Sequence, residues 1–304
     1  MKKKVLVLGS NGLVGNSVSS YLKDKKFEVI KSNREDTNLF SFQSTKELIS
    51  NTAPHIIVNA AAKVGGIYAN DTHRTEFLLS NLKINMNVLE SCIPYKDIKI
   101  INLGSSCIYT LNAENPITEN SFMEGKLEPT NSPYAMAKLT AIELGRSLSQ
   151  QHGHKVINLM PTNLYGPNDN FDQKYSHVIP GLISRMFEAK NNNLSNFKIW
   201  GSGKPLREFL YVKDLSDCIA FIIENNIELD LINVGSGVEV SIKELAIKIQ
   251  TIIGFEGSLS FDSSKPDGNP RKLLDSSLIN DLGWKAETDL MTGLKSTIEW
   301  YRNN

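Results

Sequence analysis

The sequence has 304 residues, of which 40% are hydrophobic and 22% are charged, and its 33 basic and 33 acidic side chains give a formal net charge of zero. These values are typical of a globular chain that can bury a large core, in one domain or two. The balanced charge gives no reason to expect nucleic acid or an anionic membrane as a partner, so any anionic ligand must be held by local charges.

Apolar runs and cysteines indicate the compartment. The apolar run after Met1–Lys4 is too short for a signal-peptide core, and no run approaches the roughly 20 apolar residues that span a bilayer. Cys92, Cys107 and Cys218 are odd in number and lack the spacing of a metal site. We therefore expect a cytoplasmic protein with no membrane segment and no metal ion.

A glycine-rich turn joins the first predicted strand to the first predicted helix. Val5–Leu8 is an apolar run suited to a strand buried on both faces, and Leu13–Lys25 has the pattern of a helix. In a dinucleotide-binding turn, one glycine permits the tight turn, a second lets pyrophosphate approach the backbone, and a third lets helix pack on strand. The residues predicted to form this turn are Gly9, Ser10, Asn11, Gly12, Leu13, Val14 and Gly15. Glycines at such a turn can also be purely structural.

The residues after the second predicted strand, Phe27–Ile30, bear on the choice between NAD and NADP. An acid near the end of this strand usually holds the ribose hydroxyls of NAD, whereas an arginine suits the 2′-phosphate of NADP. Lys31 and Arg34 therefore favour NADP. The acidic pair Glu35-Asp36 follows closely, which leaves NAD as the alternative.

Strands and helices then alternate along the chain. The predicted strands cover about 55–58, 99–103 and 156–160, and the predicted helices about 44–51, 75–91 and 133–151. This alternation indicates a parallel sheet with right-handed crossovers, whose ligands bind beyond the carboxyl ends of the strands. A glycine-containing loop, 63–67, and Ser105 and Cys107 are expected at that edge.

The second part of the chain is less regular. Strands are predicted over 197–200, 208–212, 231–234 and 259–261, and helices over 176–190, 214–225, 241–253 and 290–301. Ser241 and Glu244 match a capping box. We therefore predict an α/β fold: a Rossmann-type doubly wound parallel sheet over 1–168, completed by parts of 201–240, and a smaller α/β substrate-binding cap formed mainly by 169–304.

Two histidines flank Gly153 at the end of a predicted helix. A metal site needs more ligands than His152 and His154 provide, so we expect both to be solvated capping residues.

Tyr134 and Lys138 lie four residues apart, on one face of a predicted helix. A tyrosine has an unperturbed pKa of about 10, and a nearby ammonium stabilises the phenolate and lowers that pKa. A serine hydroxyl, that of Ser105, would hold the substrate oxygen that the tyrosine must protonate. This set of groups is suited to the reduction of a ketone or the oxidation of an alcohol, although a lone tyrosine–lysine pair is also common on exposed helices.

Blocks distributed over nearly the whole chain match one known pattern. They are residues 9–15, 60–67, 103–109, 127–131, 134–138, 161–167, 176–180, 200–203, 207–210 and 264–268. With these blocks the chain resembles the GDP-L-fucose synthase family of extended short-chain dehydrogenase/reductases. Members of that family epimerise C3 and C5 of GDP-4-keto-6-deoxy-D-mannose and then reduce C4 with NADPH, which yields GDP-L-fucose. The segments Ser105-Ser106-Cys107 and Ser176–Pro180 carry the most specific part of the resemblance.

The resemblance implies roles for five catalytic residues. Cys107 would act as the base and His177 as the acid of the epimerisation, since unperturbed thiols and imidazoles titrate near ~8.5 and ~6.5. Tyr134, Ser105 and Lys138 would stabilise the enolate oxygen, and Tyr134 would then protonate O4. Without the resemblance, Cys107 would be read as a small buried hydrophobe and His177 as a helix-start residue bonded to backbone.

The resemblance also implies the ligands. The residues expected to bind NADP(H) are the turn 9–15, Arg34, Leu103, Gly104, Ser105, Ser106, Lys138, Pro161, Thr162, Asn163, Leu164 and His177. The residues expected to bind a GDP-sugar are Asn163, Arg185, Trp200, Arg207 and Asp267. Arginines suit a diphosphate through bidentate contacts, whereas a tryptophan can equally be a core residue. The family often has a basic residue where Asn11 stands. One expected contact to the 2′-phosphate is then missing, which weakens the prediction of NADP over NAD.

Two other interpretations of the chain stay open. One is a related GDP-4-keto-sugar reductase or epimerase with a dideoxy or heptose substrate, and the other is a non-catalytic NADP-sensing module. A homodimer through the helices at 75–91 and 133–151 is expected by analogy with the superfamily.

Overall fold

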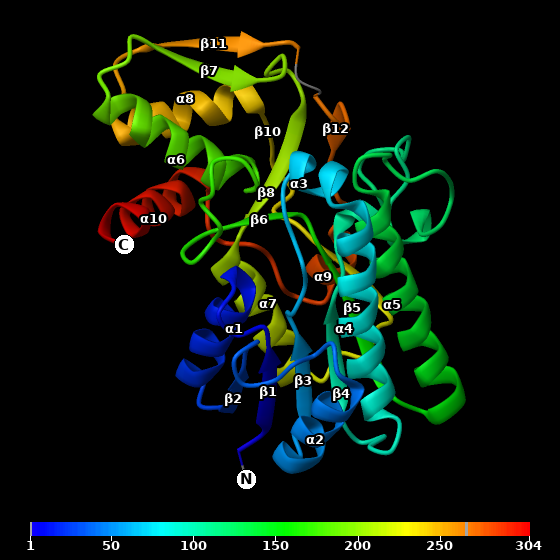
Figure 1. Ribbon diagram of the computed structural model, residues 1–304. Coiled ribbons are helices and arrows are strands. Elements are labelled where there is room, and N and C mark those ends of the chain that lie inside the picture. Colours follow the sequence, from blue (N-terminus) through cyan, green and yellow to red (C-terminus); the bar gives the residue numbers. More distant parts are fainter. Residues whose placement is uncertain (1, 265–266) are drawn as a thin grey trace.

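The computed structural model describes residues 2–264 and 267–304 and has a six-stranded parallel sheet at its centre (Figure 1). The strands follow the order β2 (Glu28–Ser32), β1 (Lys4–Leu8), β3 (Ile56–Asn59), β4 (Lys99–Leu103), β5 (Lys155–Pro161) and β9 (Leu231–Val234). The chain crosses from β2 on one side of β1 to β3 on the other. This reversal is the topological switch point of a doubly wound sheet, so the predicted fold class is confirmed.

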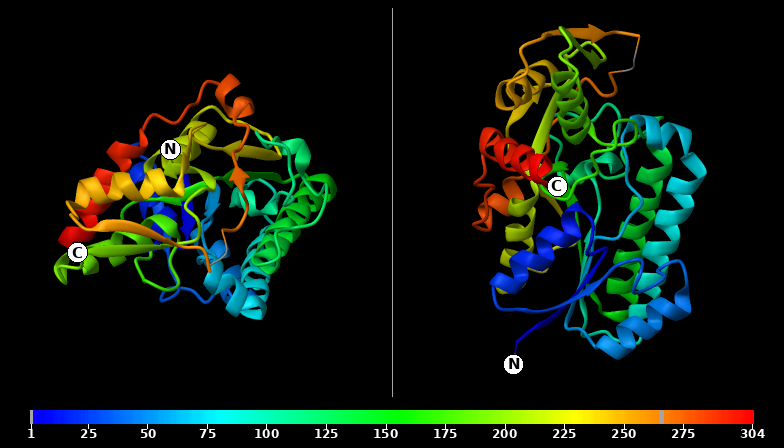
Figure 2. Two further views of the ribbon diagram at one scale, coloured as in Figure 1. Left: turned by 90° about the horizontal axis from the view of Figure 1, so that it is seen from above. Right: turned by 60° about the vertical axis from the view of Figure 1, so that its left-hand side comes forward.

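Helices cover both faces of this sheet (Figures 1 and 2). On one face lie α1 (Leu13–Asp24) and α7 (Val212–Glu224), and on the other lie α2 (Phe42–Thr52), α4 (Arg74–Cys92) and α5 (Ser132–His152). Side chains alternate along β1, so Val5 and Val7 pack toward α1 and α7 while Leu6 and Leu8 pack toward α2 and α4. Burial on both faces accounts for the unbroken apolar run of that strand.

A row of buried asparagines crosses three neighbouring strands. Asn59 on β3, Asn102 on β4 and Asn158 on β5 are register partners. Asn59 Nδ2 donates to Asn102 Oδ1 over 3.2 Å, and Asn102 Nδ2 donates to Asn158 Oδ1 over 3.1 Å. Because a buried amide is costly unless it is hydrogen-bonded, this row penalises any slip of one strand past the next.

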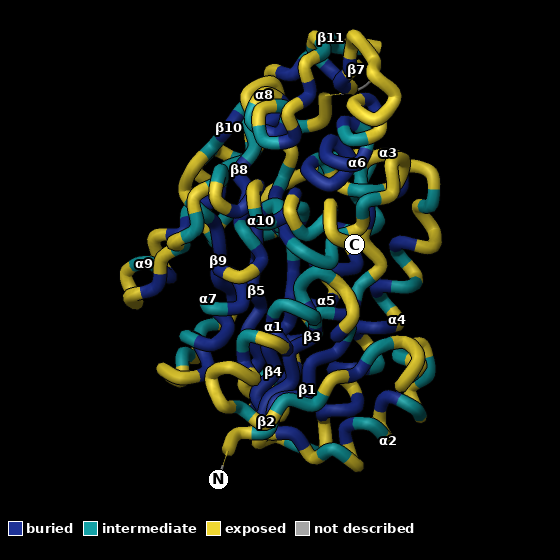
Figure 3. Tube along the Cα trace, turned by 90° about the vertical axis from the view of Figure 1, so that its left-hand side faces the viewer, coloured by how far each residue is buried: buried dark blue, intermediate teal, exposed yellow. Residues whose placement is uncertain are grey.

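The second part of the chain builds a cap above the carboxyl ends of the sheet (Figure 1). Its strands are β6 (Asn163–Tyr165), β7 (Asn196–Trp200), β8 (Leu206–Tyr211), β10 (Glu239–Ser241), β11 (Ser258–Asp262) and β12 (Arg271–Lys272). Its helices are α6 (Val178–Asn191), α8 (Ile242–Ile253) and α10 (Leu290–Asn303), and α9 (Ser277–Asp281) lies against β9. The cap has its own apolar core, and Figure 3 shows buried segments in both parts of the molecule.

Most predicted elements form within a few residues of their expected bounds, and the capping box of Ser241 and Glu244 at the start of α8 is confirmed. Three short strands, β6, β10 and β12, were not predicted, because two or three residues carry no pattern of their own. All three pair with β8, which supplies their hydrogen bonds. The short helix α3 (Ile67–Thr72) was likewise missed. Lys265 and Pro266, in the matched block 264–268, lie outside the described residues.

The prediction that His154 is solvated is wrong. Gly153 ends α5 with a φ of 76°, and the chain then turns inward. Only 4% of His154 is exposed, and its Nε2 lies 3.4 Å from Ile93 O. His152 is exposed, as predicted. Within residues 2–264 and 267–304, no group of three or more His, Cys, Asp or Glu side chains is arranged to hold a metal ion.

None of the helices in the described part of the chain is both long and apolar enough to cross a membrane.

A buried carboxylate on β8 joins the cap to the sheet. Glu208 is 0% exposed, its Oε1 accepts from Gly237 N over 2.7 Å, and its Oε2 accepts from Leu274 N over 3.1 Å. Its carbonyl accepts from Thr162 Oγ1 and Asn163 Nδ2, just beyond β5. Burial raises the pKa of Glu208, and the hydrogen bonds to its carboxylate oppose that rise.

Replacing this carboxylate by an amide tests its role. In Glu208→Gln one N–H donor would face an NH2 group instead of an oxygen, so we expect a loss of about 1–3 kcal/mol in the free energy of unfolding. Urea denaturation monitored by circular dichroism measures it, with Glu256→Gln at an exposed position as the control. Equal stability of the two variants would contradict this role for Glu208.

Candidate active site

The turn between β1 and α1 leaves the first helix open at its N-terminus. Gly9 has a φ of 75°, and a Cβ there would lie 2.8 Å from Ala61. A Cβ on Gly15 would collide with the carbonyl of Gly9, so this residue lets helix and turn pack closely. Gly12 is exposed, and a Cβ there would meet nothing closer than 3.6 Å. The backbone amides at the start of α1 are therefore accessible to a phosphate group.

The end of β2 lies beside this turn, because Ser10 N donates to Ser32 O over 3.0 Å. The hydroxyls of Ser10 and Ser32 are buried and have no hydrogen-bond partner within the described residues. Arg34 is exposed in the loop just beyond. Buried unpaired hydroxyls beside an open helix N-terminus, with a cation close by in the sequence, fit a phosphate-bearing dinucleotide.

Lys138 and Tyr134 project from α5 toward the end of β4. Lys138 is 2% exposed, and its Nζ donates to Leu103 O over 2.6 Å and lies 5.7 Å from the centre of the Tyr134 ring. The Ser105 hydroxyl is hydrogen-bonded to the Tyr134 phenol and also accepts from Cys107 N over 3.2 Å. The turn η1 (Ser106–Ile108) thus places the Cys107 thiol beside the same phenol.

The prediction that Lys138 lowers the pKa of Tyr134 is wrong for the protein without ligands. Burial raises the pKa of Tyr134, the nearby Cys107 raises it further, and only the Ser105 hydrogen bond opposes this. The pKa of the Lys138 ammonium is itself lowered by burial to about 8. Desolvation is the largest influence on both groups, since surrounding protein atoms disfavour the charged form of each.

His177 lies at the start of α6, in the cap. It is the N-cap residue but makes no side-chain cap hydrogen bond, and its side chain is exposed. The segment before it is held near the sheet because Gly66 N donates to Tyr175 O over 2.9 Å. Although His177 keeps contact with solvent, protein atoms crowd its ring, and this desolvation lowers its pKa. No hydrogen bond joins His177 to Cys107 within the described residues.

Two clusters of the cap contain the predicted substrate-binding residues. The Arg185 guanidinium lies 4.7 Å from the centre of the Trp200 ring, and Trp200 is 44% exposed, so it is not a core residue. Arg207 Nη2 donates to Asp267 O over 3.2 Å. The Asp267 carboxylate accepts from Ser202 N and Ser202 Oγ, each over 2.7 Å.

Arg207 connects the cap to the thiol. Burial lowers the pKa of Arg207, while the charges of Asp267 and Cys107 act in the opposite direction. The same thiol interacts electrostatically with Tyr134 and Lys138. Residues from α5, the β4 end and β8 therefore share one polar space, whereas Asn163 uses its amide to bind Glu208 O.

Asn131 is the neighbour of this group that the sequence did not single out. Its Nδ2 lies 3.5 Å from Cys107 Sγ. It belongs to the matched block 127–131 and comes just before the helix that carries Tyr134. That position, on the loop leading into the tyrosine–lysine helix, was the only available signal.

A cavity of about 480 Å³ at the opposite edge of the sheet is unrelated to these groups. Its lining includes Lys3 and Lys99, which donate to the carbonyls of Ile223 and Ile227 at the end of α7. Cations at a helix C-terminus offset its partial negative charge, so these lysines have a structural role.

The chain was compared with known proteins. Residues 5–235 match the family model described as the NAD dependent epimerase/dehydratase family. The probable GDP-L-fucose synthase 1 of Oryza sativa subsp. japonica is 46% identical over 303 residues, which cover 99% of this chain and 92% of that protein.

Solved structures of other proteins have a similar fold over nearly the whole chain. A GDP-L-fucose synthetase from Naegleria fowleri bound to NADP has a TM-score of 0.90 at 28% identity, and the match covers 100% of this chain and 95% of that one. A GDP-6-OMe-4-keto-L-xylo-heptose reductase from C. jejuni has a TM-score of 0.92 at 28% identity, with 99% and 98% covered. The chain therefore belongs to the NAD dependent epimerase/dehydratase family.

Proposed function

We propose that this protein converts GDP-4-keto-6-deoxy-D-mannose to GDP-L-fucose with NADPH, by epimerising C3 and C5 and then reducing the C4 ketone. The observation that carries the proposal is the single polar space shared by the Cys107 thiol, the Tyr134 phenol, the Lys138 ammonium and the Arg207 guanidinium. It contains a proton acceptor, a proton donor and cations for a diphosphate. The similarity to a probable GDP-L-fucose synthase supports this substrate.

The open turn between β1 and α1 would hold NADP(H). Its backbone amides suit the pyrophosphate, Lys138 suits the nicotinamide ribose hydroxyls, and Arg34 suits the 2′-phosphate. When bound, NADPH supplies the hydride for C4. The NADP-bound structural neighbour supports this choice of cofactor. Residues 1–168 together with parts of 201–240 would form the cofactor domain, and 169–304 mainly the substrate cap.

Epimerisation would use groups on the two sides of the sugar. The 4-keto group acidifies the C3 and C5 protons. At each carbon in turn, Cys107 as thiolate would accept the proton and His177 from α6 would donate one to the opposite face. Before the second carbon reacts, the thiol would lose its proton to solvent and the His177 ring would regain one. Ser105 and Tyr134 would donate hydrogen bonds to the enolate oxygen that forms.

Reduction would use Tyr134 as the acid. Burial raises the pKa of this phenol, so it stays protonated at neutral pH and can donate its proton to O4 as hydride reaches C4. Ser105, which is hydrogen-bonded to the phenol, would hold the same oxygen.

The cap would bind the GDP part of the substrate. Arg185 and Arg207 suit the diphosphate, the exposed Trp200 offers a flat apolar surface, and Asp267 can accept from guanine N–H groups or ribose hydroxyls. Asn163, close to Glu208, would position the sugar.

A second candidate is a related 4-keto-sugar reductase, which the heptose-reductase neighbour supports. A reductase alone needs Tyr134, Lys138 and Ser105 but not a thiol and an imidazole. The presence of both Cys107 and His177 favours the bifunctional reaction. A sensing module would have no use for the tyrosine–lysine pair.

Solvent isotope incorporation tests the two steps separately. With GDP-4-keto-6-deoxy-D-mannose and NADPH in D2O, we expect deuterium at C3 and C5 of the product. Cys107→Ser should suppress this labelling while NADPH still binds. Tyr134→Phe should slow NADPH oxidation, followed at 340 nm, by about 10²–10⁴-fold because the proton donor for O4 is lost.

Two outcomes would contradict the proposal in part or in full. Unlabelled product would refute the epimerase half and leave the reductase. A lack of NADPH oxidation with several GDP-4-keto sugars would favour the sensing module.

The pKa of Lys138 predicts a pH dependence of cofactor binding. Burial lowers this pKa to about 8, so the ammonium is present below that pH and is lost as the pH rises through it. NADPH affinity, measured by fluorescence titration between pH 6.5 and 9.5, should therefore fall above about pH 8. Lys138→Met should remove this dependence, and Lys83→Met, at an exposed position on α4, should keep it. A flat profile in the unmodified protein would contradict this role for Lys138.

We also propose that the protein is a cytoplasmic homodimer. The neighbouring helices α4 and α5 expose Leu79, Met86 and Met136, which are 48%, 47% and 49% exposed. Exposed apolar side chains on two neighbouring helices suit burial against a second copy of the chain. A reducing compartment suits three free cysteines.

Sedimentation velocity at micromolar concentration tests the dimer. We expect a dimer for the unmodified chain and a monomer for Met136→Asp, because a buried carboxylate would oppose association. Ile247→Asp, at an exposed apolar position on α8, should stay dimeric. A monomeric unmodified chain would refute the proposal.

A further inference from the structure

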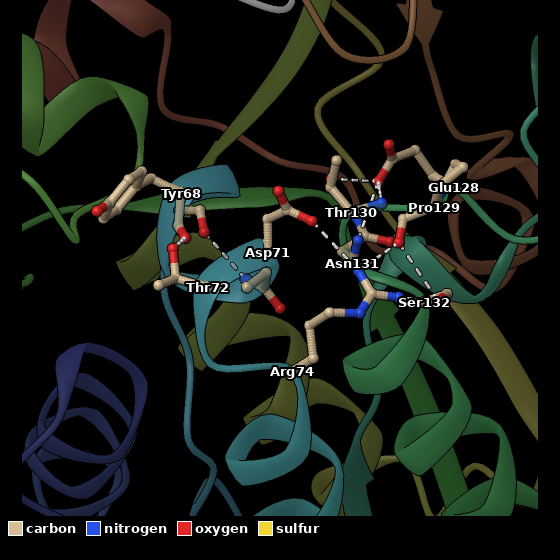
Figure 4. A network of polar contacts seen from close by, with 11 residues as sticks. Tyr68, Asp71, Thr72, Arg74, Glu128, Pro129, Thr130, Asn131 and Ser132 are labelled. Atoms are coloured by element: carbon tan, nitrogen blue, oxygen red, sulfur yellow. Dashed lines mark hydrogen bonds and ion pairs between the residues drawn. The ribbon is translucent and has the colours of Figure 1, made fainter.

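The turn that leads into α5 is held by a carboxylate. Glu128 Oε2 accepts from Thr130 N and Asn131 N, each over 3.1 Å, and from Thr130 Oγ1 over 2.6 Å (Figure 4). Three donors on one oxygen fix the backbone of Asn131 relative to Glu128.

An arginine at the start of α4 holds the same turn from the other side. Arg74 Nη1 donates to Pro129 O over 2.9 Å, Arg74 Nη2 donates to Ser132 Oγ over 3.3 Å, and Nη1 pairs with Asp71 (Figure 4). The turn is therefore held by α4 through Arg74 as well as by α5, into which it leads. These contacts restrain the backbone position from which the Asn131 side chain extends.

The Asn131 side chain is directed at the thiol rather than at its own helix. Its Nδ2 donates to Cys107 Sγ over 3.5 Å. Asn131 is the N-cap residue of α5, but its side chain makes no cap hydrogen bond to the helix within the described residues. Its Oδ1 is buried and has no hydrogen-bond partner in the part of the chain that the structure describes. The fold thus gains little from this amide, and its placement favours a role at the thiol.

Three other side chains lie close enough to the thiol to interact with it. Tyr134 and Lys138 from α5 and Arg207 from β8 interact with it electrostatically. Neither the ammonium nor the guanidinium donates a hydrogen bond to Sγ within the described residues. The Asn131 amide is the directional donor.

We propose that Asn131 is a positioning residue of the active site: its Nδ2–H donates to Cys107 Sγ, which orients the sulphur and stabilises its thiolate form. This proposal deepens the proposed function, on which the role of Cys107 as base rests. The amide adds no proton and accepts none. It acts only through the sulphur, while the Glu128 carboxylate and Arg74 hold it in place.

Alkylation of the thiol tests the proposal without any substrate. Iodoacetamide forms an S–C bond with the thiolate and releases iodide, so its rate follows the thiolate fraction. Cys92 and Cys218 are both 0% exposed, and burial raises the pKa of Cys92 to about 12 and raises that of Cys218 as well. Mass spectrometry of the Cys107 peptide therefore reports the reaction at the site.

Two variants separate donor from acceptor. In Asn131→Ala we expect the midpoint of the alkylation pH profile to rise by about one unit, which makes alkylation about tenfold slower at a fixed pH below the midpoint. Asn131→Asp should shift it at least as far, because it replaces the donor with a negative charge. Asn112→Ala, the same substitution at an exposed position outside this turn, should leave the profile unchanged. NADPH binding by each variant serves as the check that it is folded.

The outcomes decide the proposal either way. A profile that is unchanged in both Asn131 variants, or shifted equally by Asn112→Ala, would overturn it. A shift for Asn131→Ala but not for Asn131→Asp would show that the oxygen acts as an acceptor and would also overturn the assignment. In the D2O experiment, product labelled at C3 and C5 together with an unchanged alkylation profile would refute Asn131 alone. Unlabelled product with a shifted profile would refute the epimerase function alone.

Discussion

The hydrogen bond from the Lys138 ammonium to the Leu103 carbonyl is the contact on which the candidate site depends. It joins the helix that carries Tyr134 to the strand whose end carries Ser105 and Cys107. A buried ammonium is costly without a partner, so the carbonyl fixes the position of the Lys138 ammonium at the end of β4, while the buried side chains of α5 hold the helix. The tyrosine one turn earlier is thereby set against the hydroxyl and the thiol.

Burial raises the pKa of the Tyr134 phenol and lowers the pKa of the Lys138 ammonium. It keeps the phenol protonated and makes the ammonium easier to deprotonate, because both charged forms are poorly solvated. A protonated phenol is what the reduction of a ketone requires. The tyrosine–lysine spacing correctly predicts that the two side chains share a face of the helix. It cannot reveal how strongly they are desolvated, since the atoms that cover them come from elements distant in the sequence.

Features set by neighbouring residues could be predicted from the sequence, whereas contacts between residues distant in the sequence could not. The turn at Gly9–Gly15, the long helices and the buried strands of the sheet follow from periodicity and turn chemistry, which are local. The short strands β6, β10 and β12 depend on pairing with β8, and the burial of His154 depends on its contact with Ile93. The contact of Asn131 with Cys107 joins residues 24 positions apart. No local pattern marks contacts of this kind.

Strand β8 shows why the cap and the chemistry are mechanically linked. Successive side chains of a strand point to opposite faces, so Glu208 faces the junction between sheet and cap, where it binds Gly237 and Leu274. Arg207, one residue earlier, faces Asp267 and the charge of Cys107. The backbone of β8 therefore carries, on adjacent residues, the carboxylate that joins the cap to the sheet and the cation proposed to bind the substrate beside the thiol.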